Sequence, residues 1–259
     1  MIFMALPLTA GKLVSLLHGS ELLRHGRRLR RLLRRAHCVI VPSKFTQSLV
    51  TKEIKTVVAL PAPCAAATQP VTDRKPHSGI RILTLARLHP RKGQIDVARA
   101  LALLPVEIRQ TVTYQVGGTG QPAYLRQVAR ICRVAGAAFE YLGPIPPEQL
   151  AATYAQCDIF AMTSRSLPNS VEGFGIAFLE AGYHGKPVIG YRSGGEAEAV
   201  VTGATGWLVT EADVPAVADI ITKLIVDPVL RKKIGEQGRQ HARQFSWDRT
   251  AGIIAAAID

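Results

Sequence analysis

Runs of consecutive apolar residues recur along the chain, and the segments between them alternate apolar and charged positions with a helical period. Short apolar runs bounded by glycine, proline or small polar residues are typical of strands buried on both faces of a sheet. The predicted strands span residues 12–17, 38–43, 57–60, 80–85, 112–116, 139–142, 159–163, 188–191 and 206–209.

The intervening segments predict helices. They span residues 22–36, 94–104, 124–135, 147–156, 214–226 and 228–244, with one more after Gly175 and a last one ending at Ile258. Strands that alternate with helices predict parallel sheets covered on both faces, so the expected fold class is α/β. Residues 61–77 are rich in proline and small residues and predict a linker between residues 1–60 and residues 78–245.

The stretch from residue 172 to residue 188 combines features that favour an anion site. Gly173 and Gly175 predict a strand-to-helix turn, where unpaired backbone N–H groups and the positive end of the helix dipole attract phosphate. Glu172 precedes the turn and Glu180 lies more than one helical turn beyond it, and both carboxylates suit hydroxyl partners. A diphosphate between two hydroxyl-bearing sugars is the outline of a nucleotide sugar.

The run EGFGIAFLEAGYHGKPVIGYRSGG, which begins at Glu172, resembles the E-x7-E motif of retaining GT-B glycosyltransferases of glycosyltransferase family 4 (group 1). The resemblance implies two Rossmann-like domains. Residues 1–60 would be the acceptor-side domain, truncated because its early strands have no counterpart here. Residues 78–245 would bind the nucleotide sugar, and residues 246–259 would form a helix that crosses back to the first domain.

The same resemblance implies roles for the residues of this motif. Glu172 would contact the transferred sugar, and Glu180 would bind the ribose. The amides around Phe174 and Gly175 would face the donor phosphate or sugar.

Two cations follow the first strand of the second domain. Arg87 and Lys92 lie where a doubly wound sheet binds its ligands, and they could grip a diphosphate as it leaves. The segment is similar to the family's G-R-L-x-x-x-K-G, with Ala86 in place of the first glycine. Arg91 is interpreted as a surface cation. Gly118 follows the next strand, either as a donor-side glycine or as part of a tight turn.

Two further residues have a functional and a structural interpretation. His18 ends a strand and resembles the amino-terminal-domain histidine that points into the family's interdomain cleft near the donor sugar. The resemblance implies a catalytic role for it, although a histidine there can be purely structural. Glu198 follows the family's G-G-x-x-E, and a carboxylate in that place can also stabilise a helix N-terminus.

The composition limits the possible cofactors and the compartment. Four cysteines lack C-x-x-C spacing, the histidines lack metal-ligand spacing, and D-x-D is absent, so a metal-independent, cytoplasmic protein without disulfides is predicted. The apolar N-terminus lacks a preceding basic region, which disfavours a signal peptide, and no apolar run is long enough to span a membrane.

Positive charge is concentrated near the start of the chain. The net charge is +13, and residues 1–60 hold 11 lysines and arginines against 2 acidic residues. In the helix predicted at 22–36, with Ser20 as its N-cap, one face carries Leu22, Leu29, Leu32, Leu33 and Ala36, and the other carries seven arginines. The favoured interpretation is peripheral contact with an anionic membrane surface, ahead of simple solvation and of nucleic-acid binding.

The sequence therefore predicts a retaining glycosyltransferase. It would use a nucleotide diphosphate sugar as donor substrate, without a further cofactor, and a glycan or lipid-linked acceptor at the inner face of the membrane. The alternative is a truncated, non-catalytic homologue that binds nucleotide sugar or membrane. No nucleic-acid partner is predicted, since no aromatic stacking platform accompanies the basic helix.

Overall fold

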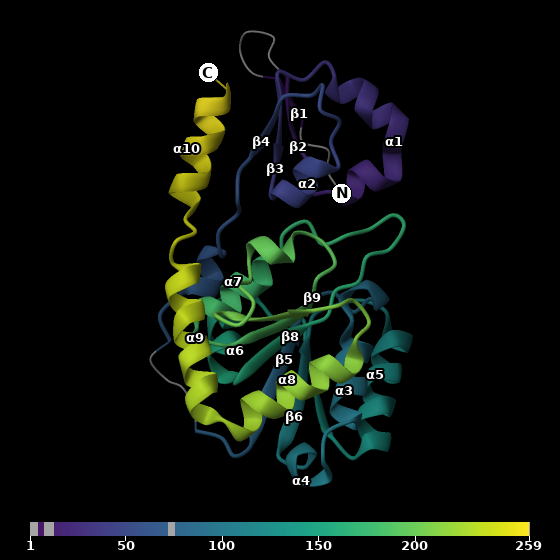
Figure 1. Cartoon of the computed structure of the whole chain (residues 1–259), viewed down its shortest axis with the longest axis vertical. Coiled ribbons are helices and arrows are strands. Elements are labelled where there is room, and N and C mark those ends of the chain that lie inside the picture. Colours follow the sequence, from purple (N-terminus) through teal and green to yellow (C-terminus); the bar gives the residue numbers. More distant parts are fainter. Residues whose placement is uncertain (1–4, 8–12, 72–75, 259) are drawn as a thin grey trace.

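The computed structural model describes residues 5–7, 13–71 and 76–258 of the chain. It has two α/β parts stacked along the long axis of the molecule, each built on its own sheet (Figure 1). Lys12 of the first predicted strand, residues 72–75 of the predicted linker and Asp259 of the predicted last segment lie outside the described residues.

The larger sheet is formed by six parallel strands in the order β10-β9-β8-β5-β6-β7. Its strands are β5 (Ile80–Leu85), β6 (Val112–Gly117), β7 (Ala138–Gly143), β8 (Ile159–Met162), β9 (Val188–Tyr191) and β10 (Gly206–Val209). The chain adds strands on one side of β5 and then returns to add strands on the other side. The carboxyl ends of β5 and β8 therefore meet at a point where the strand order reverses, which is where such sheets bind ligands.

Neighbouring strand residues point to opposite sides of this sheet, and apolar residues lie on both sides. Helices therefore cover both of its faces. Ile82 packs in the core under α3 (Gln94–Ala102), α5 (Pro122–Ala135) and α8 (Val214–Val226). Leu83 packs in the core under α6 (Pro147–Gln156), α7 (Ile176–Tyr183) and α9 (Pro228–Ala242). The short helix α4 (Val106–Arg109) joins α3 to β6.

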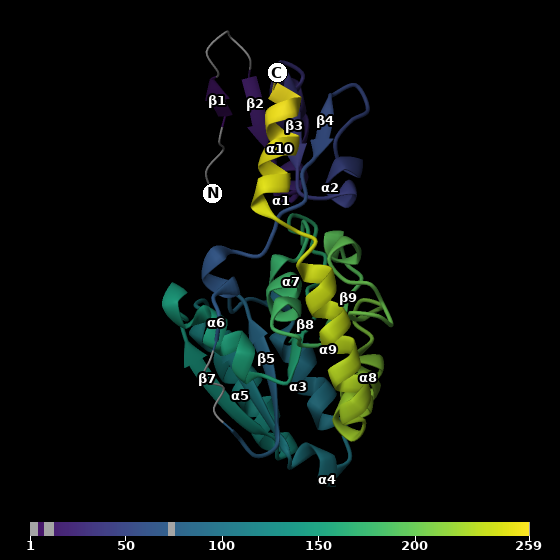
Figure 2. The ribbon, with the colours of Figure 1, turned by 90° about the vertical axis from the view of Figure 1, so that its left-hand side faces the viewer.

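The smaller sheet has the order β1-β2-β3-β4. The strands are β1 (Ala5–Pro7), antiparallel to β2 (Leu13–Leu16), and then β3 (Cys38–Val41) and β4 (Thr56–Val58) in parallel. One face packs against α1 (Ser20–Leu33). The opposite face is covered by α10 (Trp247–Ile258), which returns from the larger part (Figure 2).

The arginine-rich helix differs from its prediction. Gly26 has φ 28° and ψ −111°, so α1 is broken there, and it ends at Leu33 instead of residue 36. The predicted apolar stripe is also wrong at Leu32, which is 55% exposed, whereas Leu29 and Leu33 are buried. Ser20 is also not the N-cap, because Gly19 takes that position and provides no side-chain acceptor.

Four short helical segments complete the description. The helix α2 (Lys44–Ser48) follows β3, and Ser43 caps it by accepting the Thr46 N–H. Single 3₁₀ turns occur in the linker at η1 (Ala65–Thr68), after β5 at η2 (Pro90–Lys92) and after β9 at η3 (Gly195–Glu198). No helix in the described ranges combines the length and the apolar character needed to cross a bilayer.

Candidate functional site

A cleft of about 620 Å³ lies between the two sheets, at the carboxyl ends of β5 and β8. It is lined by the smaller sheet, by the loops after β5 and β8, by the start of α7 and by α10. Six of the residues predicted from the sequence line it: His18, Arg87, Lys92, Glu172, Phe174 and Gly175. Gly118 and Glu180 are not among its lining residues.

Glu172 is the centre of a charged cluster in this cleft. Its Oε2 atom accepts hydrogen bonds from Lys92 Nζ, from Arg91 Nη1 at 3.2 Å and from Ser164 Oγ at 3.3 Å. Burial alone would raise the pKa of Glu172, but the charges of Lys92 and Arg91 outweigh it and hold the pKa below its ordinary value. The carboxylate is therefore ionised and held in one orientation.

The role expected for Arg91 is corrected by this cluster. Its side chain is not a solvated surface cation, because it is 17% exposed and paired with Glu172. Arg91 and Lys92 are consecutive in the tight 3₁₀ turn after β5, and both side chains reach one carboxylate on the loop after β8. Sequence spacing carries no signal for this contact, since the two loops meet only in the folded sheet. Ser164 was missed for the same reason.

The glycine turn brings the backbone close to the cleft. A Cβ atom at Gly173 would lie 2.4 Å from the carbonyl oxygen of His18, so only glycine allows the loop to pack against the smaller domain. Gly175 has φ 90° and is the N-cap of α7. Gly175, Ile176 and Ala177 line the cleft, so the amino end of α7 and its dipole face it.

Gly118 has a structural place in the fold. It has φ 128°, and a Cβ atom there would lie 2.1 Å from the carbonyl oxygen of Ala86. Only glycine lets the end of β6 pack so closely against the loop that carries Arg87. This geometry agrees with the tight-turn interpretation, and the donor-side interpretation stays a prediction.

Glu180 lies one helical turn deeper than Ile176 and is buried under the linker. Its carboxylate accepts the Tyr154 hydroxyl at 2.8 Å and the Cys64 N–H at 3.3 Å. Both carboxylate oxygens therefore have protein partners. The ribose contact inferred from the motif stays a prediction.

Glu198 joins the two domains. Its carboxylate accepts the N–H groups of Lys44 at 2.9 Å and Phe45 at 3.0 Å, the first residues of α2. A carboxylate at a helix N-terminus was one of its two expected roles, but the helix belongs to the other domain. Ser20 also crosses the interface: its hydroxyl donates to the Val171 carbonyl oxygen at 3.3 Å and accepts the Val171 N–H at 3.2 Å.

Glu196 was missed by the sequence analysis. It is fully buried behind the glycine turn, and its Cγ would lie 3.6 Å from a Cβ atom at Gly175. Ser193 donates a hydrogen bond to Oε1 at 2.6 Å, and Oε2 has no partner in the described part of the chain. Burial raises the pKa of Glu196 to about 7, against the opposing hydrogen bond from Ser193 and with the help of the nearby charge of Glu172.

The described residues contain no group of three or more histidine, cysteine, aspartate or glutamate side chains placed to hold a metal ion. Cys38, Cys64, Cys132 and Cys157 form no disulfide within the described part of the chain.

Two α/β domains that face each other across a cleft, with strand ends and a helix N-terminus directed into it, define a GT-B fold. The solved structure of sucrose-phosphate synthase from Thermosynechococcus elongatus matches with a TM-score of 0.80 over 94% of this chain and 66% of that one, at 23% identity. Anabaena HepE, solved with UDP and glucose, matches with a TM-score of 0.77 over 95% of this chain and 71% of that one, at 24% identity.

The chain belongs to the glycosyl transferases group 1 family, whose family model matches residues 68–241. It is 37% identical over 182 residues to a GDP-mannose-dependent alpha-(1-6)-phosphatidylinositol monomannoside mannosyltransferase of Mycolicibacterium smegmatis. It is 34% identical over 177 residues to a D-inositol 3-phosphate glycosyltransferase of Corynebacterium efficiens. These matches take in 68% and 66% of this chain but only 47% and 41% of the relatives, so the chain spans about half of their length.

Proposed function

We propose that this protein is a retaining glycosyltransferase that transfers a sugar from a nucleotide diphosphate sugar to a hydroxyl group. The observation that carries the proposal is the ionised Glu172, fixed by Arg91 and Lys92 beside the amino end of α7. A fixed carboxylate can accept hydrogen bonds from sugar hydroxyls, and cations with helix amides can hold a diphosphate. The cleft thus offers one place for each half of a nucleotide sugar.

We propose that these groups carry out the transfer without a metal ion. The bond between the anomeric carbon and the phosphate oxygen breaks, and the acceptor hydroxyl forms a new bond on the same face of the sugar. The proton of that hydroxyl passes to the leaving diphosphate. Arg87, Lys92 and the α7 amides would stabilise the charge that develops on the diphosphate. Retention would follow from same-face attack or from a short-lived ion pair.

The relatives support a class of donor and acceptor. One is named for GDP-mannose and a phosphatidylinositol monomannoside, and another for D-inositol 3-phosphate. We therefore propose a lipid-linked or polyol acceptor, with His18 as a catalytic residue of the cleft near the donor sugar. Peripheral contact with the inner face of a membrane through α1 belongs to the same proposal, because its arginines at positions 24, 28, 30 and 31 are exposed.

The test combines donor binding with turnover. A thermal-shift panel of GDP, UDP, ADP and their sugars should show one nucleotide class that raises the melting temperature. A ligand at a hundredfold over its Kd adds about 2.7 kcal/mol, or roughly 5–10 °C for a protein of this size. Lys92→Ala should reduce this shift. Glu172→Gln should keep most of the melting shift but lower the rate of nucleotide release during turnover by about 100-fold or more.

Matched variants separate the site from general charge effects. Lys52 and Glu107 are exposed, so Lys52→Ala and Glu107→Gln should behave as the wild type. Donor binding without turnover in the wild type would favour the non-catalytic alternative. Wild-type turnover in both Lys92→Ala and Glu172→Gln would overturn the proposal.

A further inference from the structure

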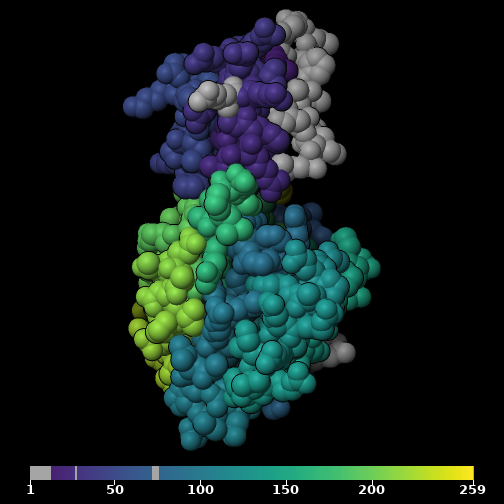
Figure 3. Space-filling model, turned by 90° about the vertical axis from the view of Figure 1, so that its right-hand side faces the viewer, coloured from purple at the N-terminus to yellow at the C-terminus, as the bar shows by residue number. Residues whose placement is uncertain are grey.

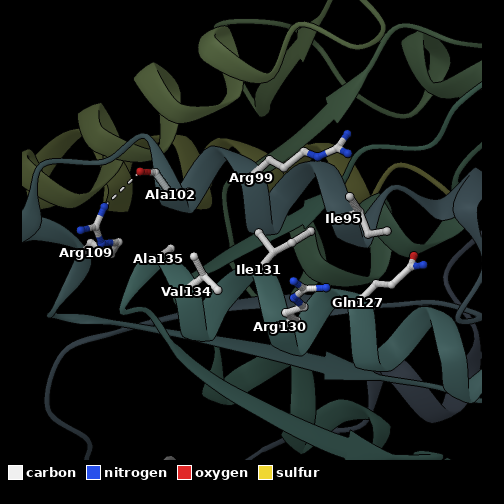
Figure 4. Close-up of a pocket in the computed structure, with 9 residues that line it drawn as sticks. All are labelled: Ile95, Arg99, Ala102, Arg109, Gln127, Arg130, Ile131, Val134 and Ala135. Carbon is white, nitrogen blue, oxygen red and sulfur yellow. Dashed lines mark hydrogen bonds between the residues drawn. The ribbon is translucent and has the colours of Figure 1, made fainter.

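A second hollow, of about 800 Å³, lies on the outer surface of the larger domain, away from the cleft. It runs between α3 and α5 and is closed at one end by α4 (Figure 4). We call it the α3–α5 groove. It is lined by Ile95, Arg99, Ala102, Arg109, Gln127, Arg130, Ile131, Val134 and Ala135.

The charged residues of this groove are all positive. Arg99, Arg109 and Arg130 come from three different helices, and no acidic residue lines the groove in the described ranges. The nearby Asp96 is 2% exposed and paired mainly with Arg165, at 2.6 Å, which leaves Arg99 57% exposed with a longer ion pair of 3.5 Å. The groove therefore favours an anionic partner.

The floor of the groove is apolar. Ile131 and Val134 lie between the arginines, with Arg99 on one side and Arg130 on the other (Figure 4). Val134 is 80% exposed, so its apolar side chain is accessible to a partner. Apolar area flanked by cations fits a partner that is itself both apolar and anionic.

The groove and the arginine-rich helix of the other domain face the same way. Figure 1 places α1 at the upper right and α3 and α5 at the lower right, and Figure 3 shows the same side with both regions on the surface. Two separated basic regions on one side of an elongated molecule match an extended planar surface better than a single peptide.

We propose that the α3–α5 groove is a second membrane-docking site, which binds the headgroup region of anionic phospholipids through Arg99 and Arg130 and places Val134 against the acyl boundary. The larger domain then contacts the bilayer directly, in addition to the contact proposed for α1. The groove is separate from the donor cleft, so docking there does not depend on donor binding.

The experiment measures sedimentation of the whole chain with vesicles. Vesicles of phosphatidylcholine with phosphatidylglycerol should bind the wild type, and phosphatidylcholine vesicles should not. The double variant Arg99→Gln/Arg130→Gln should lose affinity by roughly 10-fold or more, because each basic residue near an anionic surface adds to binding. Val134→Ser, which changes no charge, should lower affinity by about 2- to 5-fold. Arg109 is left intact because it donates to the carbonyl oxygens of Ala102 and Leu104.

The matched control removes two charges from the opposite face. Lys232 and Lys233 are exposed on α9, which covers the other side of the sheet, so Lys232→Gln/Lys233→Gln should bind as the wild type. Equal losses in the two double variants, or no loss in either, would overturn the proposal. Arg28→Gln/Arg31→Gln measures the α1 contribution separately. The rise in melting temperature caused by the donor, measured without vesicles on the same variants, tests the proposed donor binding independently.

Discussion

Glu196 and Glu198 stand two residues apart in one short turn and have different environments. Glu198 accepts two backbone N–H groups across the domain interface. Glu196 is fully buried with one carboxylate oxygen unpartnered, and its pKa is raised to about 7. Near neutral pH it therefore exchanges a proton directly behind the turn that carries Glu172.

This raised pKa predicts a pH-dependent stability. Between pH 4.5, the ordinary pKa, and about 7, the folded protein keeps a proton on Glu196 that the unfolded chain has released. The free energy of unfolding therefore falls as the pH rises through this range, by at most on the order of 3 kcal/mol. Glu196→Gln, which imitates the neutral carboxyl group, should melt several degrees above the wild type at pH 8. It should melt close to the wild type at pH 4.5.

The difference in melting temperature between Glu196→Gln and the wild type separates the effect of Glu196 from that of the histidines. Burial lowers the pKa of His184 and His241, so their contribution to stability rises with pH and opposes that of Glu196. These contributions cancel when the variant and the wild type are compared at each pH. A melting difference that stays constant from pH 4.5 to pH 8 would show that Glu196 does not titrate in this range.

At the scale of elements, the short helix α2 depends on capping from two directions. Ser43 accepts the Thr46 N–H within the same domain, and Glu198 accepts the Lys44 and Phe45 N–H groups from the other domain. Glu198→Ala should lower the free energy of unfolding by about 1–2 kcal/mol. It should also speed hydrogen exchange of the Lys44 and Phe45 amides.

The comparison variant for this prediction is Glu236→Ala. Glu236 is half-exposed and pairs with Arg239 within one helix, so its loss should cost less than about 0.5 kcal/mol. If amide exchange at Lys44 and Phe45 is unchanged in Glu198→Ala, the contact across the interface does not stabilise α2.

Elements could be predicted from the sequence where one local pattern determines them. The strands at 188–191 and 206–209 and the helix at 147–156 match the structure residue for residue, because apolar runs and flanking glycine and proline define them. The break in α1 could not be predicted, because the helical period of the leucines and arginines continues on both sides of Gly26. A glycine inside a periodic segment permits a break but does not require one.

The residues of the candidate site could be predicted where they belong to a single local motif or come directly after a strand. Lys92 and Glu172 come from separate motifs, and both line the cleft. The environments of Arg91 and Glu196 could not be predicted, because they are formed by loops that are far apart in the sequence. The contact between the linker and Glu180 could not be predicted for the same reason, since the Cys64 N–H reaches that carboxylate only in the folded chain.

At the scale of the whole molecule, α10 ties the two domains together. Its Trp247 Nε1 donates to the Pro63 carbonyl oxygen at 3.0 Å, and its Thr250 hydroxyl donates to the Leu60 carbonyl oxygen at 2.6 Å. Ala257 then packs with Val14 and Ile40 on the smaller sheet. Because α10 covers one face of this small sheet, we expect the stability of the sheet to depend on α10.

Ala257→Asp tests this dependence. A carboxylate at this position would be buried among the apolar residues between α10 and the smaller sheet, and the cost of burying it is on the order of 3 kcal/mol. We expect α10 to detach from the sheet. Hydrogen exchange should then quicken in β2 and β3, while β5 and β9, in the separate cores of the larger domain, keep their protection. Ala256 is exposed on the same helix, so Ala256→Asp adds the same charge without burying it and should leave exchange unchanged. Equal loss of protection in both sheets would mean instead that the two domains unfold as one cooperative unit.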